Sequence, residues 1–219
     1  MPKQIYIVED HPVVRRGLAS LVEPEPDLTI SGEAGSAREA RQHLSETTPD
    51  LVLLDLSLEE GSGLSLLEHL HATQPDLPIL VVSMHDEALY ARRALDNGAL
   101  GYLMKSNATE EIVEAARQVL DGNVYLSAEM TSMIVSERVG DGEPDNMSPL
   151  DALTDRELEV LMLLGEGHER REIAEELALS PKTIDTYKKN LQEKLSLSSN
   201  AGLRRYAAVW KASGNLPPE

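Results

Sequence analysis

Residues 51–63 read LVLLDLSLEEGSG, a near-continuous aliphatic run that ends on a carboxylate and passes into a polar loop with two glycines. An unbroken aliphatic run of this length is typical of a strand buried on both faces of a sheet. Asp55 stands at the end of that strand. A carboxylate at the mouth of a buried strand is costly unless a cation or hydrogen bonds compensate its charge. The stretch therefore predicts that other charged groups meet Asp55 at this end of the strand.

The first 122 residues alternate short apolar strands with amphipathic helices. The predicted strands are residues 5–9, 28–34, 51–56, 79–84 and 100–105. The predicted helices lie near residues 12–22, 36–48, 63–73, 87–97 and 108–121. Strict alternation of five strands and five helices predicts an α/β fold, a doubly wound five-stranded parallel sheet with helices on both faces. In such folds the functional site lies at the carboxyl ends of the strands.

Charge is distributed unevenly along the chain. The formal net charge is -18, and residues 1–122 carry 9 basic against 21 acidic side chains. Residues 181–211 carry 7 basic against 2 acidic side chains. A local basic patch on an acidic protein predicts two domains with different roles.

Cysteine is absent, which excludes disulfides and thiolate metal sites and favours a reducing compartment. The first residues, MPKQIYIVED, lack the pattern of a signal peptide. No apolar run approaches the roughly 20 residues that a membrane span needs. We therefore expect a soluble, cytoplasmic protein with no membrane partner.

From Leu153 onward the pattern is wholly helical and predicts a second, smaller all-α domain. Thr154 and Glu157 have the spacing of a capping box at the start of its first helix. Ser180 and Pro181 are suited to cap and begin its third helix. The expected organisation is a first domain over 1–122, a helical and flexible linker over 123–150, and a second domain over 151–216.

Polar groups stand at the ends of four predicted strands. Glu9 and Asp10 end the first strand, Asp55 follows the third, Ser83 lies on the fourth and Lys105 on the fifth. Clustered carboxylates raise each other's pKa values unless a cation intervenes, and hard oxygen ligands favour Mg²⁺. A carboxylate nucleophile beside a divalent cation, a lysine and a hydroxyl is suited to accepting a phosphoryl group.

These strand-end residues, together with Gly101-Tyr102, resemble the receiver domain of bacterial two-component response regulators. The stretch VVSMHDEALYARRALDNGALGYLMK is most similar to the NarL/FixJ subfamily. The resemblance implies a flavodoxin-like receiver in which Asp55 accepts a phosphoryl group from a sensor histidine kinase. It also implies that Lys105 and Ser83 contact the phosphoryl oxygens, and that Ser83 and Tyr102 form a switch pair.

The same resemblance implies a Mg²⁺ site. Its expected ligands are Asp10, Asp55 and the backbone carbonyl of Ser57, with Glu9 reaching the ion through water. One departure is that proline is frequent in the loop after the phosphoacceptor, where this chain has Glu59 and then Glu60. The extra acid is expected to weaken phosphorylation or to alter loop rigidity.

Two histidines flank the predicted pocket. His11 follows the acidic pair of the first strand, and His85 follows the fourth strand. Both are expected to face solvent.

The segment KTIDTYKKNLQEKLSL, residues 182–197, has a polar and an apolar side. Ile184, Tyr187, Leu191 and Leu195 recur at helical spacing and should face a core. The opposite side carries Lys182, Thr183, Asp185, Thr186, Lys188, Lys189 and Gln192. Such a face suits insertion into the major groove of DNA, but periodicity alone favours a solvated face of a small helical bundle.

The stretch LTDRELEVLMLLGEGHERREIAEELALSPKTIDTYKKNLQEKL resembles the LuxR-type helix-turn-helix signature over nearly its full length. The resemblance implies a four-helix domain whose third helix, about 182–195, reads DNA and whose fourth often supplies a dimer contact. Asp185 stands where the family often has lysine, and Tyr187 where it often has histidine. A carboxylate facing the groove repels phosphate but can accept a hydrogen bond from cytosine N4.

The function expected is that of a response regulator transcription factor, active as a homodimer on promoter DNA. Release of the DNA-reading helix after phosphorylation is the expected mechanism. An enzyme such as a phosphatase would need a second catalytic acid and a substrate pocket, and the sequence offers neither. The remaining alternative is a regulator whose helical domain binds a protein partner rather than DNA.

Overall fold

The computed structural model describes residues 1–213 apart from 59–61, 86, 140–148, 151 and 178. The chain divides into two compact units, residues 1–140 and 141–219. The predicted boundaries at 122 and 150 stay predictions. The acidic stretch 140–148, a part of the linker expected over 123–150, lies outside the described residues, as do Glu59 and Glu60.

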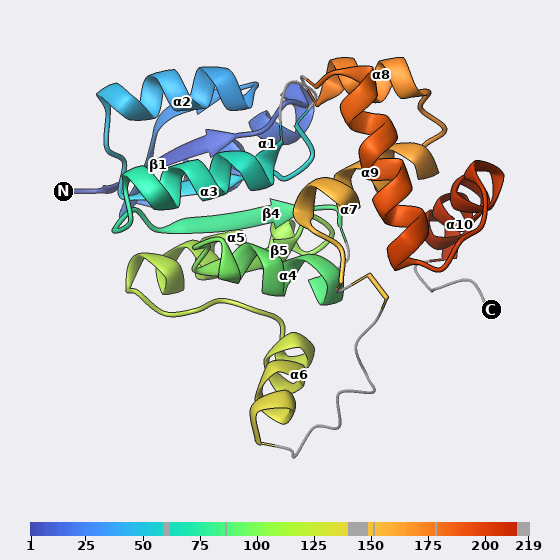
Figure 1. Ribbon diagram of the computed structural model, residues 1–219. Coiled ribbons are helices and arrows are strands. Elements are labelled where there is room, and N and C mark those ends of the chain that lie inside the picture. Colours follow the sequence, from blue (N-terminus) through green and yellow to red (C-terminus); the bar gives the residue numbers. More distant parts are fainter. Residues whose placement is uncertain (59–61, 86, 140–148, 151, 178, 214–219) are drawn as a thin grey trace. The chain divides into compact units, whose positions relative to one another are not determined.

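A five-stranded parallel sheet forms the centre of the first unit (Figure 1). Its strands are β1 (Lys3–Val8), β2 (Leu28–Ala34), β3 (Leu51–Leu54), β4 (Ile79–Ser83) and β5 (Gly101–Met104). Their order is β2-β1-β3-β4-β5, so the switch point lies between β1 and β3. The predicted doubly wound fold is confirmed. Polar residues expected at the strand ends therefore lie just beyond β1, β3 and β5, or on the last residue of β4.

Five helices connect and follow the strands. They are α1 (Pro12–Val22), α2 (Ala37–Glu46), α3 (Gly63–Thr73), α4 (Glu87–Asp96) and α5 (Ala108–Leu120). Apolar residues of α1 and α5 pack in one cluster with Ile5, Ile7 and Leu53, which share one face of the sheet. Tyr6, whose side chain points to the opposite face, reaches His43 of α2 through its hydroxyl at 2.7 Å. Helices therefore cover both faces, as the alternating pattern predicts.

The receiver-like core is almost wholly aliphatic because the chain has no Phe and one Trp. All residues of β3 and β4 are buried, in keeping with strands covered on both faces. Tyr102 is the largest fully buried side chain of this unit. Its burial places a hydroxyl inside the sheet layer, next to the carboxyl ends of the strands.

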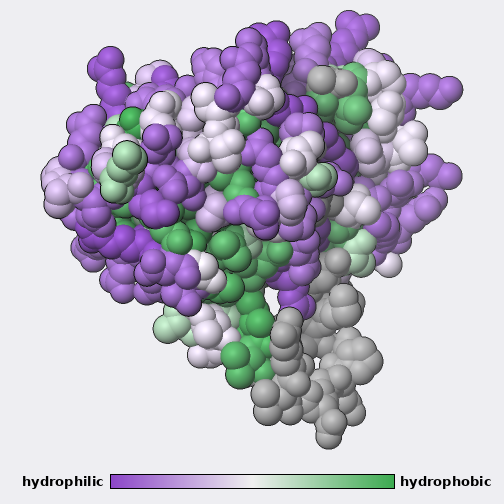
Figure 2. Space-filling model, turned by 90° about the vertical axis from the view of Figure 1, so that its left-hand side faces the viewer, coloured by the Kyte–Doolittle hydropathy of each residue, from purple (hydrophilic) through white to green (hydrophobic). Residues whose placement is uncertain are grey.

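A sixth helix, α6 (Ala128–Val139), follows the last helix of the α/β layer and contacts α4. Val124, Met133 and Val135 are exposed in or just before it. The face drawn in Figure 2 is mostly hydrophilic, with an apolar area running from its centre downward. Among the described residues no helix has the length and apolar character needed to cross a bilayer.

The second unit is all-α. Its helices are α7 (Asp155–Gly165), α8 (Arg170–Glu176), α9 (Pro181–Lys194) and α10 (Asn200–Ser213). Thr154 and Glu157 form the predicted capping box, and Ser180 caps α9 with Pro181 in its first turn. Leu158, Leu161, Ile173, Ile184, Leu191, Leu203 and Trp210 are buried in its core. The predicted helix-turn-helix order, α8 followed by a short turn and α9, is confirmed.

Candidate functional site: an acidic pocket at the strand ends and an exposed helix face

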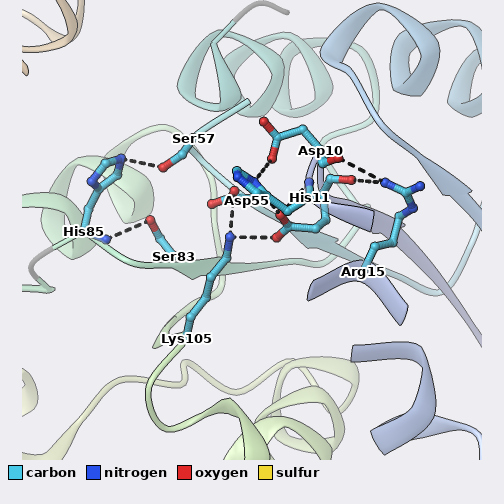
Figure 3. A network of polar contacts seen from close by, with 9 residues as sticks. Asp10, His11, Arg15, Asp55, Ser57, Ser83, His85 and Lys105 are labelled. Carbon is cyan, nitrogen blue, oxygen red and sulfur yellow. Dashed lines mark hydrogen bonds and ion pairs between the residues drawn. The ribbon is translucent and has the colours of Figure 1, made fainter. Parts of the chain in front are cut away.

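The carboxyl ends of β1, β3, β4 and β5 bring the predicted polar residues together (Figure 3). Glu9 and Asp55 are 0% and 2% exposed, and Ser83 is fully buried. The backbone N–H of Asp55 donates to the carbonyl of Val8, which fixes the end of β3 beside the end of β1. The backbone N–H of Lys105 donates in the same way to the carbonyl of Ser83. Sheet register, rather than local sequence, therefore sets the mutual positions of these side chains.

Lys105 supplies the positive charge that the buried strand end requires. Its Nζ lies 2.8 Å from Oδ2 of Asp55 and 2.7 Å from Oε2 of Glu9, so one ammonium group bridges two buried carboxylates. Burial and the charge of Asp55 raise the pKa of Glu9, although hydrogen bonding to Lys105 opposes this. Burial alone would lower the pKa of Lys105, but the charge of Asp55 and hydrogen bonds to both carboxylates raise it.

The acidic pair at the end of β1 is held from two sides. Arg15 of α1 donates from Nη1 to the backbone carbonyl of Glu9 at 2.6 Å. His11 Nδ1 lies 2.7 Å from Oδ1 of Asp10, and its ring is 64% exposed, as expected from the sequence. A hydrogen bond to the Asp10 carboxylate and its negative charge raise the pKa of His11. Asp10 is thereby fixed at the mouth of the pocket.

Ser83, Tyr102 and Ser57 meet at His85. The hydroxyl of Ser83 accepts from the backbone N–H of His85 at 3.1 Å, and the Tyr102 hydroxyl donates to the carbonyl of His85 at 2.9 Å. The His85 ring stacks on Tyr90 at 4.7 Å, and its Nε2 lies 2.8 Å from the hydroxyl of Ser57. The expectation that His85 faces solvent is wrong, because the turn after β4 folds its ring toward the loop after β3.

The oxygen atoms of the pocket fit a hard divalent cation. Oδ1 of Asp55 is buried and has no hydrogen-bond partner within the described part of the chain, so it keeps a free coordination position. Ligand atoms of Glu9, Asp10 and His11 lie within 4.8 Å of one another. Asp55 is outside that group, and its other oxygen lies 2.8 Å from Nζ of Lys105. Carboxylate oxygens are the ligands that Mg²⁺ prefers in proteins.

Gly63 is a site-supporting residue that the sequence reasoning did not single out. It begins α3, and a Cβ built on it would overlap the carbonyl oxygen of Asp55 and the Cα of Leu56. Its N–H donates to the carbonyl of Leu56 at 3.2 Å. A glycine eight residues after the acidic strand end is the available sequence signal, and it indicates a close backbone approach only once the fold is known.

The polar face expected on the third helix of the second unit is present on α9. Ile184 and Leu191 are fully buried and Leu195 nearly so, whereas Tyr187 is only half-buried. The seven residues of the predicted DNA face are all exposed or half-exposed: Lys182, Thr183, Asp185, Thr186, Lys188, Lys189 and Gln192. The structure thus gathers these residues on the outer side of the second unit.

Several of these side chains already have partners. Asp185 pairs with Arg170 of α8 at 2.8 Å, and Lys189 lies 3.5 Å from Glu193. Gln192 donates to the Asn200 side chain. Asp185 is therefore not an isolated negative charge on this face.

Two family profiles match the chain. The profile described as response regulator receiver domain matches residues 5–117, and the one described as bacterial regulatory proteins, luxR family, matches residues 151–207. The fold and the strand-end pocket define a receiver joined to a helix-turn-helix unit. The chain belongs to the NarL/FixJ family of two-component response regulators, which are transcription regulators.

Curated relatives match over nearly the whole chain. The transcriptional regulatory protein MctR of Rhizobium johnstonii is 33% identical over 93% of this chain and 92% of the relative. The oxygen regulatory protein NreC of Staphylococcus carnosus is 36% identical over 93% of this chain and 96% of the relative.

Solved structures match in the same way. A two-component response regulator of the LuxR family from an Aurantimonas species is 35% identical and has a TM-score of 0.59, covering 64% of this chain and 100% of that one. RcsB from Salmonella enterica serovar Typhimurium, solved on the promoter rprA with the phosphomimetic BeF3⁻, is 26% identical. Its TM-score is 0.69 over 95% of this chain and 99% of that one.

Proposed function

We propose that Asp55 is the phosphoacceptor of this response regulator and receives its phosphoryl group from a sensor histidine kinase. The observation that carries the proposal is the single ammonium group of Lys105 between Asp55 and Glu9, with Oδ1 of Asp55 buried and unpartnered among the described residues. That oxygen attacks the phosphorus atom of a phosphohistidine. The new O–P bond forms as the N–P bond breaks, and the imidazole keeps the electron pair.

Mg²⁺ belongs to the same proposal. Asp10, Asp55 and the backbone carbonyl of Ser57 would hold it, with Glu9 behind them. The bound ion supplies charge neutralisation for the carboxylates and for the transferred group. Asp10 is held in place by His11, and Arg15 fixes the backbone of Glu9, so the acidic pair is preorganised.

Lys105 and Ser83 then bind the phosphoryl oxygens, and Tyr102 responds to the movement of Ser83. Support comes from the route that joins them: Ser83 accepts from the backbone N–H of His85, whose carbonyl accepts from Tyr102. A phosphoryl group brings nearly two negative charges and three acceptor oxygens. Drawing the Ser83 hydroxyl toward those oxygens would break its bond to the turn that holds Tyr102.

The helix-turn-helix unit is proposed to bind promoter DNA through α9, as a homodimer, in the cytoplasm. Lys182 and Lys188 support this assignment, because they place positive charge on the outer face of α9. RcsB, a structural relative, has been solved on a promoter. This favours DNA over a protein partner as the ligand of the helical unit.

The test is chemical labelling of the chain. Asp55→Asn keeps the size and polarity of the side chain but removes the nucleophilic carboxylate. We expect the wild-type chain to form an acyl phosphate with acetyl phosphate and Mg²⁺, detected as a mass increase, and the variant to form none.

Asp50→Asn is the matched control. Asp50 is a half-exposed carboxylate at the start of β3, at the opposite end of the sheet, where it pairs with Lys3 at 3.0 Å. This variant should label like the wild type. Full labelling of Asp55→Asn would exclude Asp55 as the acceptor.

A further inference from the structure

An ion pair joins the two helices of the helix-turn-helix on its exposed side. Nη1 of Arg170, the first residue of α8, donates to Oδ2 of Asp185 on α9 at 2.8 Å. The side chains are 46% and 51% exposed, so both reach the surface. Asp185 lies on the same face of α9 as Lys182 and Lys189, three residues before and four residues after it. Arg170 thereby comes to the proposed DNA face from a different helix.

Stability does not account for this pair. An exposed ion pair contributes about 0–1 kcal/mol, because solvent screens it and two long side chains lose freedom. Other inter-helix ion pairs of this unit, such as Arg204 with Glu169 and Lys211 with Glu166, do not involve the polar face of α9. Among the described residues, the ion pair of Arg170 with Asp185 joins the polar face of α9 to another helix.

Arg170 keeps most of its hydrogen-bonding capacity. A guanidinium has five N–H donors in a rigid plane, and the bond to Asp185 uses one of them. Guanine presents two acceptors, O6 and N7, in the major groove, and a bidentate arginine is the commonest specific contact to them. A carboxylate behind an arginine limits the orientations of its side chain, which lowers the entropy lost on binding.

We propose that Arg170 reads a guanine in the major groove and that Asp185 is the positioning residue that holds its guanidinium. This inference rests on the proposed binding of DNA through α9. It explains a carboxylate at position 185 without requiring that it face phosphate unpaired. Because Asp185 is bonded to Arg170, it neither repels the DNA phosphates strongly nor contacts the guanine itself.

The experiment is a selection from random 20-base-pair duplexes, using the full chain with Mg²⁺ and beryllofluoride. Dissociation constants are then measured for the selected duplex and for each single base-pair change in it. For the wild type, replacing one particular G·C pair should raise the dissociation constant by about 10-fold or more. For Arg170→Ala, replacement of that pair should change the dissociation constant less than twofold, with the remaining preferences intact.

Two further variants separate the reader from its support. Arg170→Lys keeps the charge but not the planar fork, so it should keep the salt dependence of binding and lose most of the preference for guanine. Asp185→Ala should lower that preference partly and strengthen binding to unrelated duplexes. Arg171→Ala is the matched control, since it removes the same charge from the next residue of α8 and should leave the preference unchanged.

The outcomes are separable. If Arg170→Ala kept the full preference for the G·C pair, the inference would be overturned. It would also be overturned if Asp185→Ala lost the preference and Arg170→Ala kept it, because Asp185 would then be the residue that contacts the base. A wild-type chain that binds no duplex would refute the proposed DNA binding itself, and the inference with it. Circular dichroism melting of each variant shows that loss of preference is not loss of the fold.

Discussion

At the scale of single residues, the pocket is governed by one cation shared between two buried carboxylates. Asp55 and Glu9 repel each other, and this repulsion contributes to the raised pKa of Glu9. Lys105 compensates both charges at once. One oxygen of Asp55 faces this shared cation, and the other has no hydrogen-bond partner in the part of the chain that the structure describes.

Removing that cation should have a measurable cost. Lys105→Ala deprives two buried carboxylates of the cation that they share, so we expect a loss of about 3 kcal/mol in the free energy of unfolding at pH 7. The loss should shrink as the pH falls toward 4, because Glu9, whose pKa is already raised, takes up a proton and ends the repulsion. Urea unfolding followed by circular dichroism at several pH values measures it.

Lys3→Ala is the control for this prediction. Lys3 pairs with Asp50 at 3.0 Å, but its side chain is 54% exposed, so its removal should cost less than about 1 kcal/mol. Equal losses for the two variants, or a loss for Lys105→Ala that does not vary with pH, would contradict the bridging role of Lys105.

At the scale of elements, the start of α3 is pressed against the end of β3. Gly63 permits this contact, because any Cβ there would overlap backbone atoms of Asp55 and Leu56. Gly63→Ala should therefore lower the free energy of unfolding by about 2 kcal/mol and slow phosphoryl labelling of Asp55. Denaturant unfolding and the rate of labelling by acetyl phosphate check the two effects.

Gly17→Ala is its counterpart. Gly17 lies inside α1 with no heavy atom within 4 Å of a built Cβ, so alanine should raise the free energy of unfolding by about 0.5–1 kcal/mol. Labelling of Asp55 should not change. If both glycine variants behaved alike, the close approach of α3 to β3 would not be the cause.

The start of α7 depends on a buried ion pair as well as on its capping box. Glu157 is 2% exposed and accepts from Lys194 of α9 at 2.6 Å. Burial raises the pKa of Glu157, but the hydrogen bonds from Lys194 and Thr154 outweigh it and lower the pKa below its ordinary value. A lowered acid pKa contributes stability that is present above the unfolded pKa and is lost as the pH falls through the folded pKa.

Glu157→Gln keeps a hydrogen-bonding side chain for the capping box and removes only the charge. We expect it to lower the free energy of unfolding of the second unit by about 2 kcal/mol between pH 5 and 8, and to approach the wild type only as the pH falls through the lowered pKa of Glu157. Trp210, the single tryptophan and a buried residue of α10, reports this transition by fluorescence. Glu193 belongs to an exposed ion pair with Lys189, so Glu193→Gln should change the free energy of unfolding little at any pH.

At the scale of the whole molecule, a net charge of -18 opposes binding to DNA, so the basic residues of α9 must act locally. Lys188 is one of these basic residues. Lys188→Ala should weaken binding to all duplexes alike and reduce the slope of log affinity against log salt by about 1. Titrations at several salt concentrations measure the slope.

Lys211→Ala provides the comparison. Lys211 lies on α10 and pairs with Glu166 at 2.5 Å, away from the polar face of α9, so the slope should stay at its wild-type value. The net charge changes equally in both variants. A slope that falls by the same amount in both would indicate a general charge effect rather than contact at α9.

The helices, the strands and the location of the pocket could be predicted from the order of the amino acids. Alternating strand and helix periods, set by side-chain spacings of 2 and 3.6 residues, predicted the doubly wound sheet and the ends of its strands. The caps at Thr154 and Ser180 were likewise predicted, since a cap depends on residues only three positions apart. Such features depend on residues close together in the chain, so they can be predicted from the sequence.

Which side chains contact one another, by contrast, follows from the folded arrangement of the elements. Asp55 and Lys105 meet because β3, β4 and β5 are neighbours in register, although 50 residues separate them in the chain. The inward ring of His85 and the pairing of Arg170 with Asp185 depend on the course of a turn and on how α8 crosses α9. No periodicity encodes these contacts, because they result from the packing of elements distant in sequence.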